Sequence, residues 1–242
     1  MNLPAHVEEI VGELAEMPGA VAVVLGGSRA SGAYDAGSDW DLSVYYRGAL
    51  DTSLLARRGE VHSPGSWGRL MNGGAWLSSA GEKVDVLLRD LDAVELWSAR
   101  AREGVYEVDA LLGYLAGVPT YLVLAERASG LMLRGSLSAA PPFPDRLRDV
   151  GTGRWRFSSQ FSLDYARMHA RRGDRVSAMA QAAKAAVEEA HARLCARREW
   201  VCNEKRIFER AGLHDVQRLF APDALSEPLP AWVDAVARVL GG

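Results

Sequence analysis

Two short polar motifs, each set between apolar runs, constrain the fold of this 242-residue chain more than any other feature. The apolar run 20–25 leads into Gly26-Gly27-Ser28, and ten residues separate Ser28 from Asp39. Asp41 follows after one residue and leads into a second run, 42–46. The pattern predicts a strand, a glycine turn, a helical turn that Gly32 ends, and a second strand carrying two carboxylates.

The two carboxylates predict a cation site. Asp39 and Asp41 are two residues apart on a strand, so they share a face at about 6–7 Å along the chain. Like charges at this separation repel one another unless a cation lies between them. Asp85 stands alone among the apolar residues of the β-prone segment 83–88, and it needs a partner or a metal. Three carboxylates suit Mg²⁺, with Mn²⁺ as the alternative, and we expect two ions.

The glycine turn supplies the second half of the predicted site. Gly26 and Gly27 let the backbone approach a phosphate, and the first N–H groups of a helix face such an anion. Ser28 adds a hydroxyl donor, and Arg29 either adds positive charge or points to solvent. Alone, a Gly-Gly-Ser is usually a turn and an Asp-x-Asp a cap. Together at this spacing they indicate nucleotidyl transfer.

The periodicity predicts an α+β protein, in which a small mixed sheet precedes an all-α helical bundle. We expect a catalytic core at residues 1–95 and a helical domain at 96–242 that contributes the other wall of a cleft. The remaining expectations are a helix at 4–17, a loop at 59–74, a hairpin with arms at 75–77 and 83–88, helices at 92–102, 105–116, 119–134 and 203–211, a linker at 139–144, two long helices on either side of Gly173-Asp174, and a last helix around Trp232.

Composition narrows the classes of partner. The net charge of −3 and the pI near 6.0 argue against a broad nucleic-acid-binding surface. No apolar run is long enough to cross a membrane, and no secretory leader is recognisable, so we expect a cytoplasmic protein. Cys195 and Cys202 are expected on one helix, about 10 Å apart by helical rise, as buried reduced thiols.

At these motifs the sequence resembles the DNA-polymerase-β-like nucleotidyltransferase superfamily. Gly27, Ser28, Asp39, Asp41 and Asp85 match its pattern of a strand, a Gly-Ser turn, Asp-x-Asp and a third acid on a later strand. More narrowly, the chain looks like the bacterial branch of aminoglycoside and lincosamide nucleotidyltransferases. The segments 67–77 and 203–205 look like parts of bacterial members with a helical C-terminal domain. The resemblance implies that Asp39 and Asp41 hold metal ions. It implies that Asp85 shares the second ion, takes the proton of the acceptor hydroxyl, or does both.

Other candidates lie outside the core motif. Lys184 and Lys205 are nucleotide-binding candidates that would reach back to a triphosphate, although most lysines on helices are solvated. Asp164 is a candidate for acceptor binding or for a buried ion pair with an arginine.

Two further pairs keep two interpretations each. Asn203 and Glu204 either line the cleft or cap a helix. Trp67 and Trp76 either stack on a substrate or pack in the core.

We therefore expect a metal-dependent enzyme that transfers a nucleoside monophosphate, AMP from ATP, to a hydroxyl of a small molecule and releases pyrophosphate. One alternative is nucleotidylation of a protein or a tRNA, as in antitoxin-like members. Another is a non-catalytic nucleotide-binding module, but all three acids are present, which disfavours it.

Overall fold

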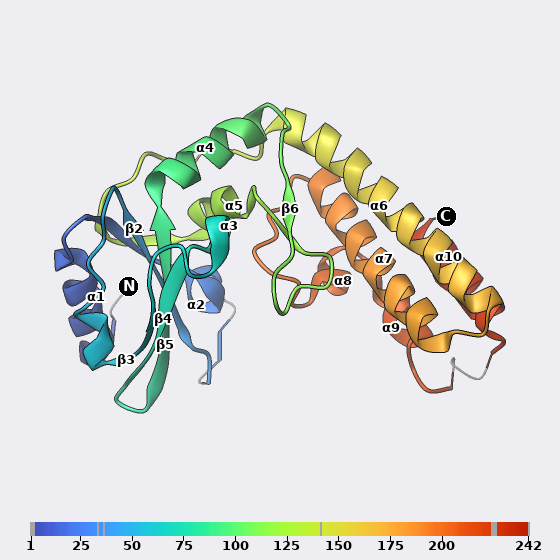
Figure 1. Cartoon of the computed structure of the whole chain (residues 1–242), viewed down its shortest axis with the longest axis horizontal. Helices are drawn as coiled ribbons and strands as arrows, with labels where there is room; N and C mark the ends of the chain where they lie inside the picture. The colour runs from blue at the N-terminus through green and yellow to red at the C-terminus, as the bar shows by residue number, and fades with distance from the viewer. Residues whose placement is uncertain (1–2, 33, 36, 141, 224–226, 242) are drawn as a thin grey trace. The chain divides into compact units, whose positions relative to one another are not determined.

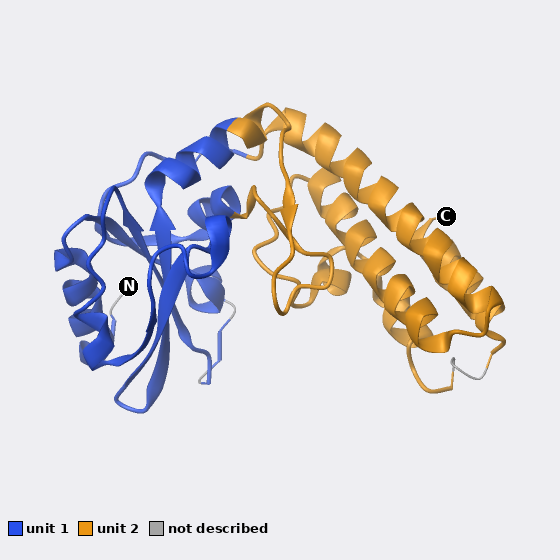
Figure 2. Ribbon diagram, viewed as in Figure 1, with its two compact units in different colours: residues 1–99, 123–142 blue, residues 100–122, 143–242 orange. Residues whose placement is uncertain are grey.

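The computed structural model of the chain describes residues 3–32, 34–35, 37–140, 142–223 and 227–241 (Figure 1). It divides into two compact units, one of residues 1–99 and 123–142 and the other of residues 100–122 and 143–242 (Figure 2). The expected fold class is confirmed, because a mixed sheet with helices precedes a region of long helices.

The first unit holds the large sheet. Its strands are β1 (Ala20–Leu25), β2 (Trp40–Tyr46), β3 (Gly59–His62), β4 (Gly73–Ser79), β5 (Glu82–Asp90) and β8 (Leu131–Gly135). Its helices are α1 (Ala5–Glu16), α2 (Gly27–Ser31), the 3₁₀ helix η1 (Leu55–Arg57) and α3 (Gly68–Met71). Most of α4 (Leu91–Arg102) and of α5 (Leu122–Ser129) also belongs to this unit, and the division between the units falls within each of these two helices. The strand order is β3-β4-β5-β2-β1-β8, with β2 and β5 parallel and the other neighbours antiparallel.

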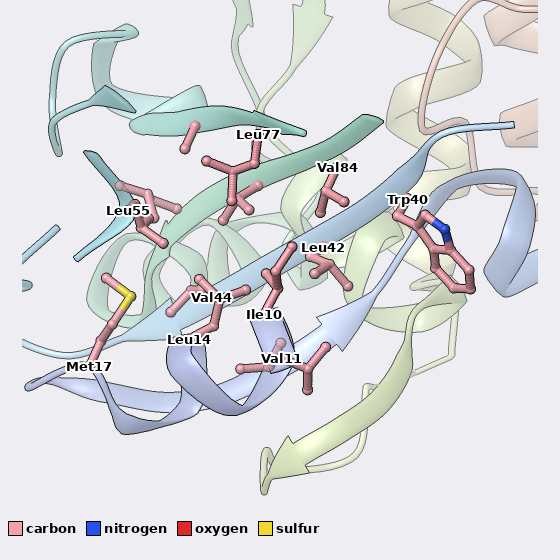
Figure 3. Close-up of a cluster of buried hydrophobic side chains, with 14 of the residues drawn as sticks. Ile10, Val11, Leu14, Met17, Trp40, Leu42, Val44, Leu55, Leu77 and Val84 are labelled. Carbon is pink, nitrogen blue, oxygen red and sulfur yellow. The ribbon is translucent and has the colours of Figure 1, made fainter. Parts of the chain in front are cut away.

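One face of this sheet forms the core. Ile10 and Leu14 of α1 pack against apolar side chains that alternate along the strands, among them Leu42 and Val44 (Figure 3). This period-two alternation places these side chains on one face of the sheet, while the opposite face buries other residues, among them Ala22, Val24 and Tyr45. The same alternation puts Asp41 and Asp85 on the face opposite the core.

The other face of the sheet carries a buried ion pair. Arg89 of β5 is 1% exposed, and its guanidinium donates two 2.7 Å hydrogen bonds to the carboxylate of Glu126 in α5. Together with the β1–β8 pairing, this contact holds segment 123–142 in the first unit, although we expected that segment in the helical domain. Gly130 is needed there, because a Cβ would lie 2.4 Å from Cγ1 of Val24.

Four predicted segments differ from the structure, and the first of these is the helix expected at 203–211, which is confined to Ile207–Arg210. The expected loop at 59–74 contains β3 and α3, and the expected helix at 119–134 is divided at Gly130 into α5 and β8. No helix forms over 105–116; β6 (Val108–Asp109) pairs with β7 (Val118–Pro119), and Gly113 and Gly117 have positive φ angles of 83° and 82° that a helix does not accept. The hairpin, the first helix and the long helices are confirmed.

The second unit is built on α6 (Asp145–Arg171), α7 (Arg175–Ala196), α8 (Ile207–Arg210), α9 (His214–Leu219) and α10 (Leu229–Leu240). Asp174 caps α7 by accepting a hydrogen bond from the Ser177 amide, as its sequence position predicted. The alanine-rich side of α7 lets α6 approach closely, and the buried Ser159 hydroxyl donates to the Ala185 carbonyl.

The two cysteines are reduced thiols that form no disulfide. Cys195 is buried on α7, but Cys202 is only partly buried and lies beyond the end of that helix. The prediction that both share one helix is therefore wrong. The helix ends at Ala196, and Arg198 takes a φ of 58°, which turns the chain away.

Candidate active site

The glycine turn lies directly against Asp41. The Gly26 amide donates a 2.7 Å hydrogen bond to the Asp41 carbonyl, which fixes the end of β1 beside β2. Gly27 has a φ of 62°, and a Cβ there would lie 1.8 Å from Oδ2 of Asp41. Only glycine lets this backbone lie so close to the carboxylate.

The helical turn after the glycines is short. α2 spans five residues from Gly27, and Gly32 ends it with a φ of 75°. Ser28 is the second residue of this turn, so its amide is among the first N–H groups, which have no acceptor within the helix. The phosphate-binding role of Gly27 and Ser28 stays a prediction. The local geometry of the turn is compatible with it.

Arg29 positions the loop before β2. Its Nε donates to the carbonyls of Ser38 at 3.1 Å and Asp39 at 3.2 Å, and a second guanidinium nitrogen donates to Ser38 at 2.6 Å. The guanidinium also lies over the Trp40 ring, 4.0 Å from its centroid. These contacts hold the backbone that carries Asp39; the expected contact of Arg29 with a nucleotide is untested.

The three predicted acids lie near one another, close to the beginnings of the central strands β2 and β5. Asp41 and Asp85 are register partners on the parallel strands β2 and β5, so their side chains point to the same face. Asp39 immediately precedes β2. One oxygen of Asp85, Oδ1, is buried and accepts no hydrogen bond.

Lys83 joins two of these acids. Its ammonium lies 2.8 Å from Oδ2 of Asp85 and 3.3 Å from Oδ2 of Asp39. The hydrogen bond to Asp85 raises the pKa of Lys83, and the weaker one to Asp39 adds to the effect, so the ammonium stays charged at neutral pH. Sequence reasoning missed this residue, although its i, i+2 spacing to Asp85 on a strand puts both on the same face.

Glu82 ties the beginnings of β2 and β5 together. Its Oε2 accepts a 2.9 Å hydrogen bond from the Trp40 indole and lies 2.8 Å from Nε2 of His6. The bond from Trp40, followed by the contact with His6, lowers the pKa of Glu82. This contact was also missed, because nothing in the sequence spacing links Trp40 to Glu82.

The donor chemistry of the acids fits a hard divalent cation. All three offer carboxylate oxygens, and the buried Oδ1 of Asp85 has no partner within the protein. Among the residues that the structure describes, no three His, Cys, Asp or Glu side chains converge as ready-made metal ligands. Lys83 stands between Asp39 and Asp85, so a cation bound by both would displace its ammonium.

Trp67 and Trp76 are brought together on the first unit. Their ring centroids are 5.7 Å apart, and the His62 ring lies 4.8 Å from Trp67 and 4.6 Å from Trp76. Trp76 is 47% exposed, so it is not a core residue.

The two lysine candidates belong to the second unit. Lys184 lies 3.3 Å from the buried carboxylate of Glu188, and Lys205 is exposed. Their predicted contact with a triphosphate stays a prediction.

The remaining candidates of the second unit have local partners. Asp164 pairs with Arg167 at 3.2 Å, but its side chain is 71% exposed, so the alternative of a buried ion pair is wrong. Glu204 accepts hydrogen bonds from the amides of Leu115 and Ala116, and Asn203 accepts one from the Lys205 amide. Neither residue caps α8, which begins only at Ile207.

A strand, a glycine turn packed on an aspartate, and acids on two parallel strands of a mixed sheet are the arrangement that the sequence motifs predicted. Residues 7–91 match the family described as "Nucleotidyltransferase domain". This part of the chain is therefore a nucleotidyltransferase domain, and the match includes the glycine turn and all three acids.

One similar solved structure is a nucleotidyltransferase-like protein from Exiguobacterium sibiricum 255-15. It is 12% identical, with a TM-score of 0.48 over 98% of this chain and 72% of that chain. A comparison with curated proteins finds no match. No helix within the described residues is long and apolar enough to span a membrane.

Proposed function

We propose that the protein transfers a nucleoside monophosphate, AMP from ATP, to a hydroxyl of a small molecule and releases pyrophosphate. The observation that carries this proposal is the register pair Asp41–Asp85, with the Gly27 turn packed against Asp41. A phosphate-binding turn and two carboxylates on one sheet face are what such a reaction requires.

In the proposed reaction the acceptor oxygen attacks the α-phosphorus in line with the bond to the leaving pyrophosphate. The new bond joins the acceptor oxygen to phosphorus, and the bond to the bridging oxygen of the β-phosphate breaks. The turn at Gly27 and Ser28 holds the phosphates through its backbone amides. Asp85 either takes the proton of the acceptor hydroxyl or serves as a metal ligand.

Domains of this family generally use divalent metal ions, and we propose two Mg²⁺ held by Asp39, Asp41 and Asp85, with Mn²⁺ as a substitute. Bound there, the ions would neutralise charge on the phosphates. The residues of this chain supply oxygen ligands, orient the turn and keep Asp85 partly out of water. We propose a cytoplasmic location, as the sequence predicted.

The direct test is incubation of the purified protein with α-³²P-labelled nucleoside triphosphates, Mg²⁺ and a panel of hydroxyl compounds that includes sugars, a protein extract and tRNA. Label on a small molecule supports the proposal. If label appears only on protein or tRNA, the acceptor is that macromolecule and the proposed small-molecule acceptor is wrong. Metal-dependent triphosphate binding without any transfer would leave a nucleotide-binding module.

A further inference from the structure

Helix α6 carries a row of aromatic side chains that point away from its own core. Phe157, Phe161 and Tyr165 follow one another at every fourth residue, so they lie on one side of the helix. They are 71%, 54% and 43% exposed. Successive rings contact one another, with centroids 6.1 Å apart for the first two and 5.1 Å apart for the last two. We call these three residues the α6 aromatic face.

The core side of α6 lies opposite this face. α7 and α10 pack against the helix (Figure 1), and Ser159, Leu163 and Ala166 are among the residues that it buries. At 3.6 residues per turn, Phe161 lies about 140–160° around the helix from each of these three. No rotation of α6 can therefore bury both sides within this unit. A surface helix of a globular protein has one apolar side, so the second apolar side of α6 calls for a second packing surface.

The size of the aromatic face fits an interface between two chains. With about 200 Å² for a whole aromatic side chain, the three rings leave about 350 Å² exposed. An exposed apolar patch of this size is often functional. Two copies in contact would bury about 700 Å² from the rings. The side chains around the rings would bring the total close to roughly 1,200 Å², the size at which specific interfaces begin.

Gly153 gives α6 a gap beside its aromatic face. It is exposed, it lies one turn before Phe157, and a Cβ built on it would have open space around it. Glycine weakens a helix interior relative to alanine, and no contact with the described part of the chain requires a glycine at this position. A side chain from a second molecule can therefore enter the gap.

A second copy of α6 that runs in the opposite direction fits this surface. If the two-fold axis passes midway between Phe157 and Phe161, each of these rings meets the other ring of the second copy. Tyr165 then comes level with the gap at Gly153 of the second copy. We infer that the α6 aromatic face is the interface of a homodimer in which the two α6 helices pack antiparallel.

The charges beside the aromatic face agree with this direction. Arg154 and Asp164 each lie five residues from the proposed axis, so each comes level with the opposite charge of the second copy. A parallel pair of helices would put like charges side by side. The Arg154 guanidinium lies over the Tyr106 ring, 4.1 Å from its centroid, and Asp164 contacts Arg167 through a side chain that is 71% exposed. Exposed ion pairs are weak, so Asp164 can exchange partners.

Sedimentation velocity of the full chain between about 1 and 100 µM tests the interface, because interfaces near the lower size limit associate weakly. We expect a reversible dimer for the wild type. Phe161→Glu should raise the dissociation constant at least about 100-fold, because it sets like charges close to the two-fold axis. Val176→Glu introduces the same charge at an 81% exposed position of α7 and should leave the dissociation constant unchanged. A monomeric wild type, or equal effects of the two changes, would overturn the proposal.

Gly153→Leu separates association from folding. Leucine favours a helix and has open space in the single chain, so circular dichroism of dilute monomer should show no loss of thermal stability. The dimer should weaken at least about tenfold, because the leucine fills the gap that Tyr165 of the second copy would enter. Unchanged association of this variant would contradict the proposed packing.

A charge exchange tests the antiparallel direction. Arg154→Glu and Asp164→Arg should each weaken the dimer about tenfold, because each sets like charges opposite one another in both symmetry-related contacts. The double variant should return to within about threefold of the wild type. A double variant as weak as the two single variants would show that these residues do not meet, and the antiparallel pairing would be wrong.

Discussion

The ammonium of Lys83 lies 2.8 Å from Oδ2 of Asp85, two residues further along the same strand. It therefore occupies the position beside this carboxylate that a metal ion would take. A bound divalent cation must compete with this positive charge for the Asp85 and Asp39 carboxylates. If metal ions bind there as proposed, Lys83 lowers the affinity of the site for them, and in their absence its charge offsets the repulsion between the two acids.

Lys83→Met should strengthen the binding of Mn²⁺ several-fold, because it removes the competing cation and keeps a long, unbranched side chain. Electron paramagnetic resonance titration of free Mn²⁺ measures this. Lys205→Met is the matched control, since it removes the same charge from an exposed position in the second unit. Equal affinities for the two variants would show that Lys83 does not compete with metal.

Asp39→Asn and Asp41→Asn should each reduce nucleotide transfer at least about 100-fold, because a carboxylate ligand is lost where several kcal/mol of charge stabilisation is expected. Circular dichroism should show an intact fold, since neither change removes buried apolar area. Asp92→Asn, an exposed acid on α4, serves as the control. Full activity in either Asp39 or Asp41 variant would mean that the site is assigned wrongly.

Gly27→Ala and Gly32→Ala separate backbone strain from the contact with Asp41. Both glycines have positive φ angles, 62° and 75°, so each substitution should cost about 1 kcal/mol of folding stability. Only the Cβ at position 27 meets the Asp41 carboxylate; position 32 has open space around it. Chemical denaturation should show a larger loss for Gly27→Ala, because its Cβ also displaces the Asp41 side chain, and the transfer assay should fail for Gly27→Ala alone. Similar activities would show that the close approach to Asp41 is unimportant.

Glu126→Gln should destabilise the first unit by about 3 kcal/mol, because the Arg89 guanidinium would stay buried without its counter-charge. Glu95→Gln is the comparison, since it breaks an exposed pair with Arg47 and should change stability by less than about 1 kcal/mol. Urea denaturation measures both. Equal, small losses would mean that Arg89 is solvated when Glu126 is changed.

Because His191 is buried, we expect the free energy of unfolding of the second unit to fall at low pH. His191 is buried on α7, stacked on Trp155 with centroids 4.5 Å apart, and neither ring nitrogen has a hydrogen-bond partner. Burial lowers its pKa to about 4, with a smaller effect of Arg210. The unfolded chain therefore binds this proton first, and about 3 kcal/mol of stability should be lost as the pH falls from about 6.5 to about 4.

His191→Phe keeps a ring against Trp155 and removes the titration. Thermal denaturation between pH 4 and 7 should show a flatter profile for this variant than for the wild type. The carboxylates titrate in both proteins, so only the difference between the two profiles reports on His191. Parallel profiles would show that His191 does not govern stability in acid.

The sequence pattern was sufficient where local physics decides the structure. The apolar run before Gly26, the Asp-x-Asp before a second run and the lone Asp85 predicted the strands, and register then brought Asp41 beside Asp85. The Asp174 cap was equally local.

Contacts between distant segments escaped prediction. The segment 123–142 joins the first unit because β8 pairs with β1 and Glu126 meets Arg89, and neither partner is visible from local periodicity. The contacts among the rings of His62, Trp67 and Trp76 likewise depend on distant residues, because Gly74 makes room for the Trp67 ring. Lys83 differs from these residues, because its i, i+2 spacing to Asp85 on one strand is a local pattern that puts both side chains on the same face.

The most direct test of the central claim is the ratio of pyrophosphate released to α-label transferred, measured with ATP, Mg²⁺ and a sugar acceptor, for the wild type and Asp85→Asn. The account predicts one pyrophosphate per transferred AMP in the wild type, and loss of both together in the variant. Wild-type protein that binds ATP but releases no pyrophosphate, or a variant that transfers label as fast as the wild type, would contradict it.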